Sequence, residues 1–261
     1  MTVLRLLWVF LRIGVLNEMA YRANFYLQAV ESLLDMGVGL ASLGVVFAHT
    51  DTLNGWQPAE LVALLGVYFI MGGVIGALIE PSMQRFMEDV RAGTLDFTLT
   101  KPEDAQVLVS LGQVRVWRLA DVVQGAVALA VALQLLQAEV GLLQGLSFAA
   151  ALLAGVLIVY SFWLILATFS FWFVRVENIL VIFQSMYEAG RWPVGIYPRW
   201  LRASLTFVVP VAFAVTVPTE ALVGRLTPRV LLGAVGLGLL LLGLARAFWR
   251  QGVQRYSGAS A

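Results

Sequence analysis

The sequence has no cysteine, one histidine (His49) and, among its seventeen basic residues, one lysine (Lys101). Without cysteine there is no disulfide and no thiolate metal site, and a single histidine excludes a two-histidine zinc motif. No glycine-rich phosphate loop precedes Lys101, and no Gly-x-Ser-x-Gly elbow occurs. His49 stands near Asp51 in a polar stretch, where a solvated role fits better than catalysis. We therefore predict that the chain is not an enzyme, has no catalytic or metal-binding residue and hydrolyses no nucleotide itself.

Charge is also scarce. Only 13% of the residues are charged and 60% are hydrophobic, with a mean hydropathy of +0.86, whereas a soluble domain has about one quarter charged residues. The excess apolar surface predicts an all-α polytopic membrane protein. The net charge of +1 argues against nucleic acid as a partner.

Six apolar runs are candidates for transmembrane helices, which need about 20 residues each. They cover about residues 25–48, 59–79, 119–136, 146–173, 179–196 and 230–249. No internal repeat is evident, so we expect one transmembrane domain over residues 1–261. Five of the seventeen basic residues fall on one side of this arrangement and the other twelve on the opposite side. By the positive-inside rule both termini are then cytosolic. The use of arginine in place of lysine hints at a GC-rich bacterium, so we expect the bacterial inner membrane.

Residues 3–21 form an apolar stretch interrupted by Arg5 and Arg12. Each arginine at the centre of a span would cost roughly 2.5–3.5 kcal/mol. We therefore expect a helix in the cytosolic interface, with the arginines at the headgroups and Trp8 and Phe10 toward the acyl chains.

The polar segment 80–118, between the second and third spans, is expected to contain a short cytosolic helix. Pro81 fits its first turn, and Gly93 is a plausible C-terminal stop. One face of this helix has helical spacing and is apolar: Met83, Phe86, Met87 and Val90. We expect this face to bind a soluble partner. The alternative is that it lies on the membrane surface or on the cytosolic ends of the same subunit.

The region 197–228, before the last span, is rich in proline, and its apolar piece 205–217 is too short for a normal span. We expect two short helices that enter the outer leaflet and return. Charged residues gather around it and form either a gate held by ion pairs or, with the aromatic residues, an interfacial anchor: Arg191, Arg199, Arg202, Glu188 and Glu220.

The first span carries Gln28, Glu31 and Asp35 on one side. Intramembrane carboxylates are costly and usually face the protein interior. They are expected to line a transport path or to pair with an arginine of a neighbouring segment; Glu31 could instead reach the inner interface. Gly72 and Gly76 in the second span are expected to serve ordinary helix packing.

The order of these elements resembles the permease subunit of ABC type-2 exporters. The segment GTLDFTLTKP is similar to a family motif through Gly93, Leu95, Asp96, Leu99 and Pro102. The stretch before the last span is similar to another through Pro193, Tyr197, Pro198, Trp200, Pro210 and Pro218. The ending QGVQRYSGAS resembles that of one six-span subfamily.

This resemblance implies two permeases, identical or homologous, with an ATPase subunit under each that binds ATP and Mg. The coupling residues would be Met83, Phe86, Met87, Val90, Gly93, Leu95, Asp96 and Pro102. The prolines and Tyr197 would form the outer gate, and a light polar load in the spans favours an amphipathic or lipid-like substrate. The alternatives are a scaffold without transport and an ion-coupled secondary transporter using Glu31 and Asp35. Secondary transporters usually have broken spans in both halves, whereas here only the second half is broken.

Overall fold

The computed structural model describes residues 3–20, 22–137, 140–173 and 177–256. These residues are helical throughout, apart from loops and an isolated bridge between Leu53 and Trp56, so the expected all-α class is confirmed. The α-helices are α1 (Val3–Ala20), α2 (Arg22–Phe47), α3 (Pro58–Val74), α4 (Glu80–Ala92), α5 (Asp96–Leu99), α6 (Ala105–Ser110), α7 (Leu119–Leu135), α8 (Leu142–Thr168), α9 (Glu177–Glu188), α10 (Arg199–Ala203), α11 (Val217–Leu222) and α12 (Pro228–Arg255).

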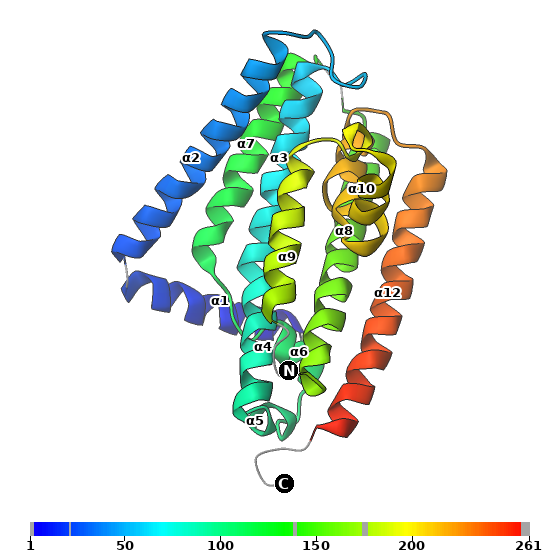
Figure 1. Cartoon of the computed structure of the whole chain (residues 1–261). Helices are drawn as coiled ribbons and strands as arrows, with labels where there is room; N and C mark the ends of the chain where they lie inside the picture. Colours follow the sequence, from blue (N-terminus) through cyan, green and yellow to red (C-terminus); the bar gives the residue numbers. More distant parts are fainter. Residues whose placement is uncertain (1–2, 21, 138–139, 174–176, 257–261) are drawn as a thin grey trace.

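The long helices form one bundle, with α5 at one end and α10 near the other (Figure 1). We call these the α5 end and the α10 end. Helix α1 lies across the α5 end, at a steep angle to the long helices. Helix α2 meets α3 and α7 at the α10 end and stands away from them toward the α5 end. This splay of α2 positions the site described below.

Five helical segments of the described residues are long and apolar enough to cross a membrane: 25–47, 58–91, 116–135, 142–171 and 228–255. The expected span at 179–196 is not among them. Helix α9 has 12 residues and so is only about 18 Å long; short 3₁₀ turns follow it at 189–191 and 194–196. In its place, the helical pieces 199–208 and 212–222 are bent by 78° and count as one broken span or as a re-entrant loop. Their entry into the outer leaflet stays a prediction.

The expected short helix beginning at Pro81 is not a separate element. Helix α3 continues through a π-helical turn at Ile75–Ile79 directly into α4, which makes one helix over 58–91. Proline removes a hydrogen bond to the carbonyl four residues earlier, here that of Ala77. The Arg115 backbone N–H donates to that carbonyl at 2.9 Å. A neighbouring segment therefore satisfies the freed group, and the helix continues to Gly93, whose φ of +69° ends it in the left-handed region as expected.

Helices α3 and α7 approach one another most closely at glycines. A Cβ on Gly66 would lie 2.8 Å from the Gly125 carbonyl oxygen, and one on Gly125 would lie 2.5 Å from the Gly66 carbonyl oxygen. Gly72 and Gly76 were expected to provide span-to-span packing. A Cβ on Gly72 would lie 3.5 Å from the Tyr187 ring of α9, and one on Gly76 would lie 2.9 Å from the Arg118 side chain. Both glycines also line a cavity.

Candidate functional site

The apolar face of α4 is buried inside the subunit. Phe86 is 1% exposed, and Met83 and Met87 are also buried. The Phe86 ring packs at 5.5 Å from Phe171 and at 5.0 Å from Trp249. Our expectation that this face is free to bind a soluble partner is therefore wrong, and the alternative that it lies against the same subunit holds; that this end is cytosolic stays a prediction. The physical reason is that the 3₁₀ turn after α8, which holds Phe171, and helix α12, which holds Trp249, bring aromatic side chains to that face.

The other residues expected to couple to a partner divide between interior and surface. Val90 is half-buried and packs against the core, and Leu95 is fully buried. Gly93 makes the turn into α5, which Asp96 begins. Pro102 is exposed. Between them stands Phe97, which the sequence did not suggest and which is 73% exposed. The apolar surface at the tip of the α5 end is thus on α5 rather than on α4.

Asp104 ties the loop after α5 to α12. Its carboxylate accepts a hydrogen bond from the Gln106 backbone N–H at 2.9 Å, which caps α6, and another from Arg246 at 2.9 Å. The hydrogen bond from Arg246, helped by the positive charge of Arg246 and the backbone N–H groups of Val107 and Gln106, lowers the pKa of Asp104 to about 2. The loop is therefore held in place by a charged contact as well as by helix packing.

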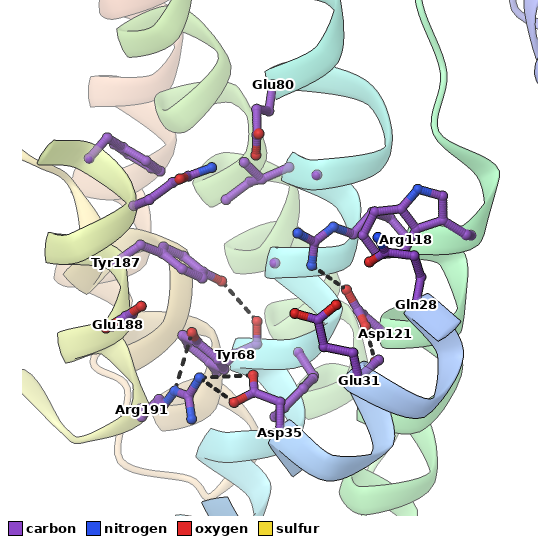
Figure 2. Close-up of a pocket in the computed structure, with 18 of the residues that line it drawn as sticks. Gln28, Glu31, Asp35, Tyr68, Glu80, Arg118, Asp121, Tyr187, Glu188 and Arg191 are labelled. Carbon is purple, nitrogen blue, oxygen red and sulfur yellow. Dashed lines mark hydrogen bonds and ion pairs between the residues drawn. The ribbon is translucent and has the colours of Figure 1, made fainter. Parts of the chain in front are cut away.

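A cavity of about 560 Å³ lies between α2, α3 with its π-helical turn, the start of α7, and α9. On α3 and its continuation, the lining extends from Tyr68 to Glu80, about 18 Å at 1.5 Å per residue. Asp35, near the middle of α2, and Arg191, just after α9, lie toward the Tyr68 side (Figure 2). The cavity thus runs from the middle of the bundle toward the α5 end.

Asp35 and Arg191 form the ion pair at the middle of the bundle. One guanidinium nitrogen of Arg191 donates to both carboxylate oxygens of Asp35, at 2.7 and 2.8 Å. The Arg191 Nε also donates to the Tyr68 hydroxyl at 3.4 Å, with the guanidinium 5.2 Å from the Tyr68 ring centre. The expected pairing of an intramembrane carboxylate with an arginine is confirmed for Asp35. The expectation that Arg191 belongs to an outer charge cluster is wrong, because the turn after α9 brings it across to α2.

A second polar group, which sequence reasoning missed, joins α2 to α7. Ser32 donates a hydrogen bond to Asp121, and Arg118 donates to the other Asp121 oxygen at 3.1 Å. Gln124 donates to the Ser32 hydroxyl at 2.8 Å. A carboxylate three residues after an arginine in an apolar helix was the signal available. The sequence analysis assigned no role to Asp121, because the sequence does not show which helix faces it.

All three residues that were expected on a transport path line this cavity. Gln28 and Glu31 join Asp35 on the α2 wall. Glu188 lines it from α9, so its expected place in the outer cluster is also wrong. Glu31 and Glu188 are exposed, and neither has an ion pair or hydrogen bond among the residues that the structure describes. Figure 2 shows both carboxylates at the hollow, on α2 and α9.

Aromatic rings form the wall between α3 and α9. Tyr187 stacks on Tyr68 with ring centres 4.9 Å apart, and Phe183 stacks on Tyr187 at 6.0 Å. The Tyr187 hydroxyl donates to the Tyr68 carbonyl at 2.8 Å. This hydrogen bond joins residues that are far apart in the sequence. Together with the stacked rings, it holds the short helix α9 against α3.

The expected outer-gate residues lie beyond the cavity. Pro193 and Tyr197 flank the 3₁₀ turn after Arg191, where the Tyr197 hydroxyl donates to the Ala189 carbonyl at 2.9 Å. Pro198 caps α10. Pro210 stands at the 78° bend, and Pro218 lies in the first turn of α11. They are not part of the cavity lining; gating by these residues stays a prediction.

The chain is similar to one known protein family. The chain matches, over residues 33–260, the model described as ABC-2 family transporter protein. No curated protein and no solved structure matches the chain. The match covers α2 through α12 except for the start of α2. It includes Asp35 and the cavity walls on α3, α7 and α9, whereas Gln28, Glu31 and Ser32 lie before it.

Proposed function

Because the chain belongs to the ABC-2 transporter family, we propose that it is the membrane subunit of an ATP-driven exporter in a bacterial cytoplasmic membrane. It moves an amphipathic or lipid-like substrate through the cavity between α2, α3, α7 and α9. The observation that carries this is a cavity of about 560 Å³ with polar walls inside an apolar helix bundle. Sites for small molecules typically occupy 300–1,000 Å³. The ion-coupled alternative is not retained, because Asp35 is already bound to Arg191.

Energy comes from a separate ATPase subunit that binds ATP and Mg. This subunit docks at the α5 end, which lies in the cytosol together with both termini. The exposed Phe97, rather than the buried Phe86, is the aromatic anchor, since exposed aromatic side chains that become buried on binding contribute most of the affinity. The single helix over 58–91 joins this end to the cavity wall, so a movement at α5 passes the turn at Gly93 and then follows one continuous helix to Tyr68.

A second permease covers the face formed by α2 and α9. Glu31 and Glu188 are exposed there, and a carboxylate exposed to hydrocarbon is costly. A second copy over this face would remove both groups from lipid and join the two cavities into one path. The Asp35–Arg191 pair then closes this path at the middle of the bundle, and the proline-rich loop after Arg191 forms the outer gate beyond it.

The docking proposal is tested by co-purifying the permease with its ATPase and measuring ATP turnover. Phe97→Ala should reduce the recovered complex at least about tenfold, because hot-spot truncations cost about 2 kcal/mol or more. Trp200→Ala is the matched control, since Trp200 is 70% exposed but lies at the α10 end. Full recovery and turnover with Phe97→Ala would overturn the assignment of α5.

A further inference from the structure

The cavity has an unbalanced charge. Five carboxylates line it: Glu31, Asp35, Glu80, Asp121 and Glu188. Three of these have an arginine partner: Asp35 pairs with Arg191, Glu80 with Arg115, and Asp121 with Arg118. With all groups ionised, two negative charges remain in the cavity, those of Glu31 and Glu188.

These two carboxylates come from opposite walls. Glu31 is on α2 and Glu188 on α9, with the hollow between them (Figure 2). Both lie in the part of the chain expected inside the bilayer, where an uncompensated charge is costly. The lining also contains apolar side chains, among them Leu34, Val38, Phe69 and Ile75. The cavity therefore combines two free negative charges with apolar surface.

We propose that the substrate is an amphipathic organic cation, held in this cavity by Glu31 and Glu188. Its positive charge compensates the two carboxylates, and its apolar groups contact the aliphatic and aromatic walls. This inference rests on the proposed function, because it names the substrate class of that transport path.

Other ligand classes fit less well. An anionic lipid headgroup would meet the two unpaired carboxylates, while the arginines of the cavity are already engaged by Asp35 and Asp121. A bare divalent cation needs several oxygen ligands together, and the described residues contain no group of three acidic or histidine side chains that could hold one. A large monovalent cation needs no such cage, because apolar contacts supply part of its binding.

The experiment uses the purified complex of permease and ATPase in nanodiscs. It is titrated with tetraphenylphosphonium and, separately, with tetraphenylborate, which has nearly the same shape and the opposite charge. Saturable binding is measured by equilibrium dialysis, and ATP turnover is followed in the same samples. We expect tetraphenylphosphonium to bind at least tenfold more tightly than tetraphenylborate and to stimulate ATP turnover.

Variants locate the site. Glu31→Gln and Glu188→Gln should each raise the Kd for tetraphenylphosphonium about tenfold, and the double variant should lose saturable binding. Glu31→Asp keeps the charge and should stay within about threefold of the original chain. Asp51→Asn is the matched control, because Asp51 is an exposed carboxylate outside the cavity. Size-exclusion profiles identify any variant that fails to assemble. If the glutamine variants fail to assemble, retained cation binding by Glu31→Asp still tests whether the charge at this position is needed.

The outcomes separate the two proposals. If tetraphenylborate binds as tightly as tetraphenylphosphonium, or if the glutamine variants bind the cation unchanged, the cation inference is overturned while ATP turnover still supports the exporter. Protonated carboxylates, or carboxylates compensated by a second copy, would give that same result. If the cation binds as expected but ATP turnover of the complex does not respond to it, the exporter proposal fails instead.

Discussion

The α5 end of the bundle and the α2 side of the cavity are held by opposite kinds of contact. At the α5 end, Phe86 is sealed among the rings of Phe171 and Trp249. In the cavity, charged groups join the walls, as in the pair between Asp35 and Arg191. Apolar contacts are non-directional and hold wherever surfaces fit, whereas a charge in an apolar bundle needs a specific partner. An apolar helix face in a sequence therefore predicts that the face is buried, but not which element covers it. A carboxylate within an apolar helix predicts in addition that a specific charged or polar group lies beside it.

The sharpest test of this comparison sets Phe86 against Phe97. Phe86→Ala should lower the free energy of unfolding by about 3–5 kcal/mol, because it leaves a cavity among packed rings. Phe97→Ala should change it by less than about 0.5 kcal/mol, since Phe97 is 73% exposed. Thermal unfolding of the permease alone in detergent measures both. Equal destabilisation by the two variants would contradict the assignment of interior and surface at the α5 end.

A second test removes the ion pair between Asp35 and Arg191 in the cavity. Removing one partner leaves the other without compensation, so Asp35→Ala and Arg191→Ala should each cost about 1–3 kcal/mol, less than for a fully buried pair because Asp35 is partly exposed. The double variant should be destabilised by less than the sum, with a coupling energy of at least about 0.5 kcal/mol. A double-mutant cycle in thermal stability checks this. Strict additivity would mean that the pair does not join α2 to the turn after α9.

The smallest effect concerns a charged contact at the α5 end, between Asp104 and Arg246. The pKa of Asp104 is lowered in the folded chain to about 2 from an ordinary value of 3.8. A lowered pKa stabilises the fold above the ordinary value, and this contribution disappears as the pH falls from 3.8 toward 2.

Because Asp104 is exposed, the contribution should be below about 1 kcal/mol. Asp104→Asn keeps an oxygen to cap α6 and removes only the charge, whereas Asp104→Ala removes both. The difference in unfolding temperature between the original chain and Asp104→Asn should therefore be present at pH 7 and shrink on acidification below pH 4. A pH-independent difference would show that the charged contact with Arg246 does not stabilise the loop.

Sequence reasoning was correct where chemistry is local. The stop at Gly93 follows from a positive φ that glycine adopts without strain, and the bend near Pro210 follows from the missing amide of proline. It also found the α2 residues of the cavity, because a carboxylate among apolar residues is conspicuous. It failed for α9, whose apolar run suggested a full span although the described helix has 12 residues.

The sequence by itself determined that this protein is an all-α membrane protein with a costly carboxylate at Asp35, because composition and hydrophobic length depend only on which residues follow one another. It also determined that Met83, Phe86 and Met87 share one face. Only the tertiary structure decided what covers that face, which arginine reaches Asp35, and that Glu31 and Glu188 line one cavity with no ion-pair partner among the described residues. Those outcomes depend on which helices lie side by side, and such contacts join residues that are distant along the chain.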